Sequence, residues 1–303
     1  KITKGKAWFT GVKDVYQVYG ELSKLLLEAT ADHKVMTNTG EVVEVKDLKG
    51  KRLMPFIKEP IHDKDLLLMG FLQGDGTLSY LYKPRLPSNT NYAIYNINHQ
   101  KDKEIQHMIG ADHLIDTIVY RTDIVPKLRQ WGFSDKTLPY RELPQYLKNI
   151  LNNPSKVTQE QLKEIKGFLS GLFSANGYVL SHSKVKVTLT TTNHNLAIQV
   201  KDLLSLIGIN SYITTRNERI KQFPNGKISK CHEEYTIEIR KYDSLLKFAN
   251  EINFIQEYKQ KALRQLLINR APYVQKVVYK GKEEVYDFSE PETHFGVVNG
   301  FIV

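Results

Sequence analysis

The stretch LMGFLQGDG at residues 68–76 returns in related form as LSGLFSANG at residues 169–177. Each copy is an apolar run with small residues four positions apart, and it ends in a polar residue followed by glycine. Small residues four apart lie on one helix face, so two such helices can pack backbone to backbone and bring their last side chains together. The repeat therefore predicts a pair of closely packed helices with a shared site at their ends. The copies differ there, because Asp75 corresponds to Asn176.

Length and composition indicate a folded protein with a basic surface. The 303 residues are enough for two domains, or for one domain beside a duplicated one. With 41% hydrophobic and 25% charged residues, the composition is typical of a soluble protein, and no apolar run reaches the roughly 18 residues that span a bilayer. The net charge of +10 fits an anionic partner such as nucleic acid, although charge alone does not separate this from a basic protein with no specific ligand.

Cysteine usage and the start of the chain bear on its compartment. The single cysteine, Cys231, excludes an internal disulfide framework and a cysteine-rich zinc site. We therefore expect a reducing compartment, the cytoplasm of a bacterial, archaeal or phage-infected cell. The first six residues lack a methionine and the hydrophobic core of a signal peptide, so we expect the sequence to be a piece of a longer one.

The pattern along the chain predicts an α+β fold in which β-rich ends flank a duplicated centre. Alternation and turn signals predict strands within residues 7–60 and again within 273–303. In the centre we expect helices at 64–75, 156–176, 194–207, 243–250 and 256–268, and strands at 77–83, 91–98, 178–182, 184–191, 210–220 and 233–241. The order helix, strand, strand, helix, strand, strand, helix is clear in the second half and looser in the first.

Asp75 is the first candidate ligand. It ends its helix before a glycine suited to the left-handed cap conformation, and a carboxylate at this end of the helix dipole is disfavoured by about 0.3–1 kcal/mol. A nearby cation would compensate, and Mg²⁺ suits a site with few carboxylates and a phosphate substrate. The alternative is an ordinary helix pair with a solvated Asp75. Two copies, each followed by a predicted strand pair, favour the site.

Residues 61–270 resemble the LAGLIDADG homing endonucleases in their monomeric, double-motif form, on the two motifs quoted above. The resemblance implies two αββαββα halves related by a pseudo-twofold axis, with the motif helices at the interface and a saddle-shaped antiparallel sheet in each half facing the DNA major groove. We expect domains at 1–60, 61–155, 156–270 and 271–303. The implied cofactor is Mg²⁺ or Mn²⁺ and the implied partner is double-stranded DNA bound by a monomer, with no membrane and no small-molecule substrate.

The resemblance also assigns the centre. Asp75 and Asn176 take the catalytic, metal-binding positions, and Gly74 and Ala175 beside them complete the predicted metal site. An amide can coordinate through its oxygen but contributes no charge and cannot act as a base, so we expect cleavage to be weak, strand-biased or absent.

Two lysines are candidates for the same centre. The segment Lys136-Thr137-Leu138-Pro139 matches the Lys-x-(Ile/Leu)-Pro segment that the family has in its first half. In the second half Lys259 is the choice and Lys261 the reserve. A lysine in this position could stabilise the scissile phosphate or help to activate water.

The strands after each motif alternate polar and basic side chains with aromatic ones, which predicts a DNA-binding face. A solvated sheet face is the alternative for any single residue. The residues expected to contact DNA are Tyr82, Lys83, Arg85, Tyr95, Lys184, Lys186, Thr188, Arg216, Arg219, Lys221, Lys227 and Arg240.

The two ends resemble the protein-splicing (Hint) domain of inteins. Thr30 and His33 match a Thr-x-x-His motif that polarises the upstream scissile peptide, and residues 285–303, with Asp287 and His294, resemble the C-terminal splicing segment. Inteins begin with Cys or Ser and end with His-Asn, whereas this sequence begins with Lys and ends with Val, so we expect no splicing from the chain as given.

The leading hypothesis is therefore an intein-encoded homing endonuclease that binds a long asymmetric DNA site and hydrolyses phosphodiesters with a divalent metal. Its rival is a DNA-binding protein of the same fold that no longer cleaves, a degenerate endonuclease or a regulator. An RNA-splicing maturase of this fold is disfavoured by the splicing-domain flanks.

Overall fold

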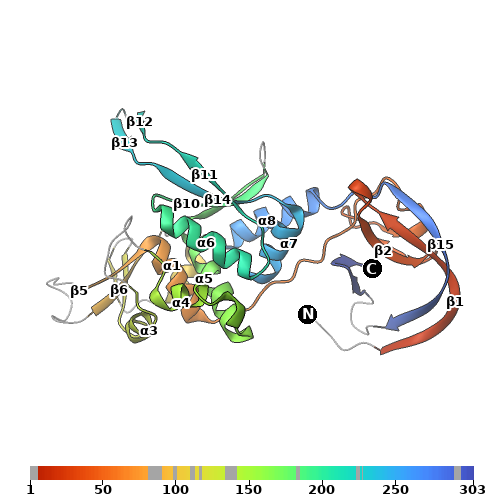
Figure 1. The fold of residues 1–303 in the computed structure, drawn as a ribbon, viewed down its shortest axis with the longest axis horizontal. Helices are drawn as coiled ribbons and strands as arrows, with labels where there is room; N and C mark the ends of the chain where they lie inside the picture. The colour runs from red at the N-terminus through yellow and green to blue at the C-terminus, as the bar shows by residue number, and fades with distance from the viewer. Residues whose placement is uncertain are drawn as a thin grey trace. The chain divides into compact units, whose positions relative to one another are not determined.

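In a computed structural model the chain divides into two compact units (Figure 1). One comprises Lys1–Ile57 and Gln265–Val303, and the other comprises Lys58–Arg264. The structure describes residues 6–80, 91–97, 101–109, 113–115, 118–133, 142–181, 185–222, 226, 228–289 and 295–303. None of the helices in these ranges has both the length and the hydrophobicity needed to cross a membrane.

The first unit is β-rich, as its alternating sequence predicts. Its elements are β1 (Lys6–Tyr19), η1 (Glu21–Ser23), β2 (Leu25–Thr30), β3 (Lys34–Met36), β4 (Val42–Glu44), η2 (Val45–Asp47), β15 (Lys276–Ser289), β16 (Val297–Val298) and β17 (Phe301–Ile302). The long strands β1 and β15 pair antiparallel and β2 adds to β1. Residues from both ends of the sequence, among them Val18, Leu27 and Val274, form one buried core. The two β-rich ends are therefore one folding unit.

The second unit contains the repeat. Its first half has α1 (Lys64–Asp75), β5 (Gly76–Tyr80), β6 (Asn91–Asn96), α2 (Lys103–Ile109), β7 (His113–Ile115), β8 (Ile118–Arg121) and α3 (Val125–Gln130), followed by α4 (Gln145–Leu151) and η3 (Pro154–Lys156). Its second half has α5 (Gln159–Asn176), β9 (Gly177–Leu180), β10 (Lys186–Thr191), α6 (His194–Leu206), β11 (Tyr212–Arg216), β12 (Arg219–Gln222), β13 (Ile228–Cys231), β14 (Glu234–Ile239) and α7 (Tyr242–Glu251). The last helix, α8 (Glu257–Asn269), continues into the β-rich unit.

The two halves share one topology. Their antiparallel sheets have the strand orders β5-β6-β8-β7 and β9-β10-β14-β11. In each sheet the first two strands along the chain are neighbours, the third lies at the far edge, and the last lies between the second and the third. The predicted α+β class and the duplicated αββαββα plan are confirmed in this respect.

Glycines let α1 and α5 approach at the level of the backbone. A Cβ atom on Gly70 would lie 1.9 Å from the carbonyl oxygen of Phe168, and a Cβ on Gly171 would lie 1.9 Å from that of Leu67. Gly70 corresponds to Gly171 in the repeat, and Leu67 to Phe168, so each helix makes the same contact on the other. This reciprocity is what an isologous, pseudo-twofold interface requires. The predicted close packing of the two motif helices is confirmed.

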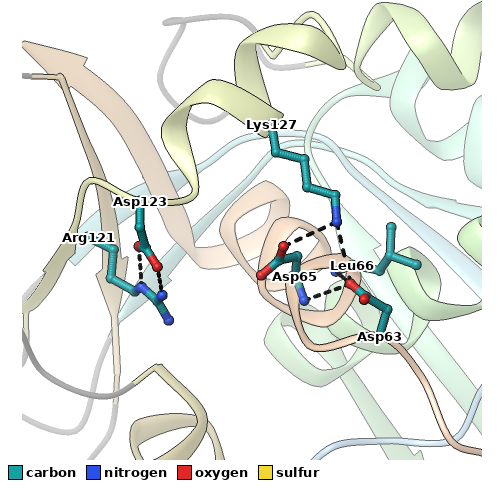
Figure 2. Close-up of polar contacts among 6 residues, drawn as sticks. All are labelled: Asp63, Asp65, Leu66, Arg121, Asp123 and Lys127. Atoms are coloured by element: carbon teal, nitrogen blue, oxygen red, sulfur yellow. Dashed lines mark hydrogen bonds and ion pairs between the residues drawn. The ribbon is translucent and has the colours of Figure 1, made fainter.

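Figure 2 shows how the start of α1 is fixed. The Asp63 carboxylate accepts hydrogen bonds from two backbone amides of the first turn, which caps the helix. The Lys127 ammonium of α3 lies 3.5 Å from Asp63 Oδ1 and 3.2 Å from Asp65 Oδ2. In the same view Arg121 and Asp123 pair in the turn before α3. Charge thus ties the N-terminal end of α1 to α3.

One feature of the second half departs from the prediction. We expected continuous strands at 210–220 and 233–241, but the chain bends at 217–218 and 232–233, and a separate hairpin, β12–β13, continues beyond the sheet (Figure 1). Its side chains include the exposed Ile220 and Ile228. The sequence predicted a turn at 224–227 only, and it gave no signal for the two bends.

Candidate metal centre and nucleic-acid face

The predicted metal centre lies where α1 and α5 end side by side. A Cβ on Gly74 would be 2.4 Å from the Cβ of Ala175, so the helices still touch at their last turn. The side-chain amide nitrogen of Asn176 donates a hydrogen bond of 3.3 Å to the carbonyl oxygen of Gly74. Gly74, Asp75, Ala175 and Asn176 are therefore brought together, as the repeat predicts.

The glycines after the two helices are needed for a different reason than expected. Gly76 has φ −137° and Gly177 has φ −97°, so neither adopts the predicted left-handed cap, and that expectation was wrong. After each helix the chain instead turns directly into a strand, and a neighbouring backbone carbonyl leaves no room for a side chain at the glycine. A Cβ on Gly76 would lie 2.6 Å from the carbonyl oxygen of Ile94, and one on Gly177 would lie 2.5 Å from that of Phe173.

Asp75 occupies an environment that disfavours its charge. It is half-buried, and this burial raises the pKa of its carboxyl group, with a further rise from the negative charge of Asp102. The ammonium of Lys259 acts in the opposite direction without cancelling the rise. A divalent cation would supply the missing positive charge.

Lys259 is a buried lysine and not a surface one. Its side chain is 8% exposed, and Nζ donates a hydrogen bond of 2.6 Å to the carbonyl oxygen of Ser174, in the last turn of α5. Burial lowers its pKa to about 8, although the nearby carboxylates of Asp102 and Asp75 favour the charged form. The reserve candidate, Lys261, is exposed and pairs with Glu257 at 2.7 Å. Of the two lysines, only Lys259 is placed beside the helix ends.

Two further residues at the centre were not predicted from the sequence. Gln256 donates from Nε2 to the Asp102 carboxylate at 2.8 Å and to the Ser174 carbonyl at 2.9 Å. The amide of Ile255 donates to Ser174 Oγ at 2.7 Å, so the segment before α8 is clamped to the end of α5. Asp102 and Gln256 are far apart in the sequence, and no local pattern links them.

The donor set suits a hard cation with few protein ligands. Within the described ranges no group of three or more His, Cys, Asp or Glu side chains is arranged to hold a metal. Mg²⁺ needs only one or two carboxylates, because it retains waters and binds substrate phosphates. The Asp75 carboxylate, the Gly74 carbonyl and the Asn176 amide are oxygen donors of the kind that it takes.

The sheet of the second half has one apolar and one polar face. Val187, Leu189, Ile237 and Ile239 are buried on the face that α6 contacts. On the other face, the register aligns Tyr178, Thr188, Glu238 and Tyr212 in one row across the four strands. Polar and aromatic side chains on one face of a sheet are of the kind that contacts a groove of nucleic acid.

The centre of this polar face is less available than predicted. Glu238, 4% exposed, accepts hydrogen bonds from Lys186 Nζ at 2.5 Å and from the Thr214 hydroxyl at 2.9 Å, and it also pairs with Arg240. Lys186 is therefore neutralised by a buried partner, a pairing that strand alternation does not reveal. Thr188 is fully buried beneath this cluster, so as folded it presents no surface to DNA.

The rim of the same face is exposed. The side chain of Arg216 is 68% exposed, and that of Arg240 is half exposed and stacks over the ring of Tyr212. Arg216 lies 3.9 Å from the Glu234 carboxylate, and the less exposed Arg219 pairs with the same carboxylate at 3.0 Å. Among the predicted basic residues whose side chains the structure describes, Arg216 and Arg240 are the most exposed.

In the first half Tyr95 differs from its prediction. It is fully buried on β6, and burial strongly raises the pKa of its hydroxyl group, so it does not face solvent as a DNA contact would. Lys221 lies on β12, and nothing further is described for its side chain. The predicted residues that lie outside the described ranges are Tyr82, Lys83, Arg85, Lys136, Lys184, Lys227 and His294.

In the β-rich unit, three of the predicted splicing-motif residues line one cavity. Thr30, His33 and Asp287 border a space of about 470 Å³, which Val303 also lines. The Thr30 hydroxyl donates to the Asp32 carboxylate and thereby lowers the pKa of Asp32. Residues about 250 positions apart in the sequence thus meet around one hollow.

Comparison with known proteins bears on the second half most directly. Residues 163–253 match the model of the LAGLIDADG-like domain, which confirms that part of the resemblance. The ATP-dependent DNA helicase Hel308 of Methanocaldococcus jannaschii is 25% identical over 135 residues, covering 41% of this chain and 11% of the helicase. The chain therefore spans only a small part of the length of that relative.

Solved structures with a similar arrangement include the homing endonuclease I-DmoI and the full-length DUF199/WhiA protein from Thermatoga maritima. I-DmoI in complex with DNA and Mn is 16% identical, with a TM-score of 0.37 and coverage of 62% of this chain and 95% of that chain. The WhiA structure is 13% identical, with a TM-score of 0.35 and coverage of 70% and 62%. Scores this low give no basis for a functional conclusion.

Proposed function

We propose that the Lys58–Arg264 unit is a site-specific, divalent-metal-dependent DNA endonuclease of the LAGLIDADG homing type, acting as a monomer on double-stranded DNA. One observation carries the proposal: the reciprocal glycine contact between α1 and α5 places Asp75 and Asn176 together at the helix ends. The polar face of the second sheet and the net charge of +10 support DNA as the substrate.

The residues of the centre would have different roles in cleavage. Asp75, with the Gly74 carbonyl beside it, would hold Mg²⁺ or Mn²⁺, which when bound supplies positive charge to the scissile phosphate and lowers the pKa of water. Lys259, fixed against Ser174, keeps an ammonium beside the site and stabilises negative charge that develops on the phosphate. Asn176 offers an amide where a second carboxylate would act, so we propose that cleavage is attenuated or confined to one strand.

A DNA-binding protein that does not cleave is the second candidate. The observation in its favour is the hydrogen bond from Asn176 to the Gly74 carbonyl, because it directs a donor at an oxygen that a cation would use. Binding through the sheet faces would survive in such a protein while the chemistry is lost.

Selection from a randomised duplex library separates the two candidates. The purified chain is incubated with the library and Mg²⁺ or Mn²⁺, and both bound duplexes and newly formed ends are sequenced. The endonuclease yields ends at one position within the enriched sequence, and Asp75→Asn removes them. A binder yields enrichment without ends, and Asn176→Asp is then the variant expected to restore cutting. If neither enrichment nor ends are found, both candidates fail.

We further propose that the β-rich unit is a Hint-type splicing domain and that the nuclease is carried within it, in a cytoplasmic protein. The cavity shared by Thr30, His33 and Asp287 supports this, and so does a match confined to 11% of a helicase, as expected of an inserted element. The test places the chain between flanks that supply an N-terminal Cys and a C-terminal His-Asn-Ser. Joined flanks are then sought by mass spectrometry. Joining that persists in His33→Ala, or no joining at all, contradicts the proposal.

A further inference from the structure

The starts of α2 and α8 lie against each other beside the predicted metal centre. Asp102 immediately precedes α2, and Gln256 immediately precedes α8. Their side chains are joined by the hydrogen bond of 2.8 Å from Gln256 Nε2 to Asp102 Oδ1. In the first turns of the two helices, Glu104 Oε1 accepts a hydrogen bond from the backbone amide of Glu257 at 3.2 Å. Asp102 is therefore held in place across the two halves of the repeat.

Asp102 is a second carboxylate near Asp75. Its charge acts on both Asp75 and Lys259, in one case disfavouring and in the other favouring the ionised form. The same Gln256 amide that binds it also binds the Ser174 carbonyl at the end of α5. Asp102 thus belongs to the same polar network as the helix ends, although it lies on neither motif.

An unpaired oxygen in this network points to a ligand. Gln256 is 1% exposed and its Oε1 has no hydrogen-bond partner in the described structure, while Nε2 of the same planar amide is bonded to Asp102 and Ser174. Buried acceptors of this kind are normally satisfied by a donor, a water or an ion. A second carboxylate beside a buried amide oxygen provides the hard donors that Mg²⁺ and Mn²⁺ prefer.

We propose that Asp102 is the second carboxylate of the divalent-cation site, in place of the one that position 176 lacks, and that Gln256 positions Asp102 and contributes Oε1. The cation is then held between Asp75 and Asp102, and Asn176 remains bonded to the Gly74 carbonyl. The inference rests on the proposed function only for the choice of Mg²⁺ or Mn²⁺ as the ion.

Manganese binding to the whole chain without DNA tests this assignment. The loss of the free Mn²⁺ electron paramagnetic resonance signal is measured for the wild type, Asp102→Asn and Glu104→Gln. The control makes the same charge change two residues further along the chain, in the first turn of α2. We expect Asp102→Asn to weaken Mn²⁺ binding by about tenfold or more, and Glu104→Gln to stay within about threefold of the wild type. Equal affinities for the wild type and Asp102→Asn, or no Mn²⁺ binding by the wild type at millimolar concentration, overturn the proposal.

A measurement on the unaltered chain covers the case in which Asp102→Asn does not fold, which circular dichroism reveals. Fe²⁺ replaces the cation, and locally generated hydroxyl radicals cut the backbone near the bound ion. Cuts near both Asp75 and Asp102 support the proposal, and cuts near Asp75 and Asn176 alone overturn it. Because DNA cleavage is not measured, an Asp102-dependent cation site in a chain that cuts no DNA would refute the proposed function and leave this inference standing.

Discussion

The side-chain amide of Asn176 donates a hydrogen bond to the backbone carbonyl of Gly74, so the second motif reaches across the helix interface to the residue that precedes Asp75. The two motif ends thus differ in chemistry as well as in charge. One presents a half-buried carboxylate with a raised pKa, and the other presents a donor that occupies a backbone oxygen.

Restoring the carboxylate at position 176 is the first test of this asymmetry. In Asn176→Asp the amide donor is lost, and a second negative charge comes close to Asp75. Without metal, like-charge repulsion should lower the melting temperature, whereas Mg²⁺ should raise it more than in the wild type. Calorimetry with and without Mg²⁺ measures both shifts. An identical Mg²⁺ response in the variant and the wild type would show that position 176 does not face the cation.

The helix interface should tolerate no added methyl group where backbone meets backbone. In Gly171→Ala the new Cβ would lie 1.9 Å from the Leu67 carbonyl, so the helices must separate, and we expect a loss of about 3 kcal/mol or more. Gly167→Ala is the matched control on the same helix, because its Cβ would be 2.9 Å from the Leu66 side chain. It should cost about 1 kcal/mol. Equal losses in urea denaturation would contradict the backbone contact.

The buried ammonium of Lys259 should give stability a characteristic pH dependence. Its pKa is about 8 in the folded chain against 10.5 for an unperturbed lysine, so between these values the unfolded chain binds more protons. The free energy of unfolding should therefore rise with pH across this window, by about 3 kcal/mol from Lys259. Below pH 8 the contribution of Lys259 should not change with pH.

Lys259→Met isolates that contribution from the other groups that titrate at alkaline pH. The difference in unfolding free energy between the wild type and the variant should change in favour of the wild type as pH rises from 8 to 10.5. Lys261→Met is the control, because Lys261 is exposed. A pH-independent difference for Lys259→Met would mean that its ammonium is not desolvated in the folded chain.

The cluster under the polar face of the second sheet should matter for stability. In Glu238→Gln the largely shielded Lys186 loses its buried carboxylate partner, which should cost about 3 kcal/mol. The carboxylate of Glu218 pairs with Lys230 on the surface, so Glu218→Gln should leave the free energy of unfolding nearly unchanged. Chemical denaturation of the two variants measures the contrast.

Glu238 also predicts a loss of stability in acid. Burial disfavours its charge, but hydrogen bonds from Lys186, Arg240 and Thr214 outweigh this and lower its pKa below 4.5. Its contribution is therefore present above that value and lost as pH falls through the lowered pKa. In Glu238→Gln this part of the acid dependence should disappear. If the free energy of unfolding of Glu238→Gln falls in acid as it does in the wild type, Glu238 does not form these hydrogen bonds.

The local pattern of the sequence was enough to predict much of the fold. The motif helix expected at 64–75 is Lys64–Asp75, and the one expected at 156–176 is Gln159–Asn176, beginning after a capping box at Thr158. Small residues four apart predicted the backbone contact of Gly70 and Gly171 because helix periodicity alone determines which residues share a face.

What the sequence could not predict depends on contacts between distant segments. Asp102 meets Gln256 because two halves of a repeat pack together, and Lys186 is neutralised by Glu238 because of the register of β10 and β14. Alternation correctly placed Lys186 on the polar face but could not reveal its partner. The bends that create β12–β13 were missed because nearby polar residues suit a continuous strand equally well.

Strand cleavage by Asp75→Asn, measured on the duplex that the wild type selects, tests the central claim most directly. In the proposed function Asp75 binds the cation that cleavage requires, while the sheets bind the DNA. The variant should therefore lose cleavage by about 100-fold or more in Mg²⁺, with the dissociation constant for that duplex within about threefold of the wild type. Cleavage at the wild-type rate by Asp75→Asn would show that the helix ends are not the catalytic centre.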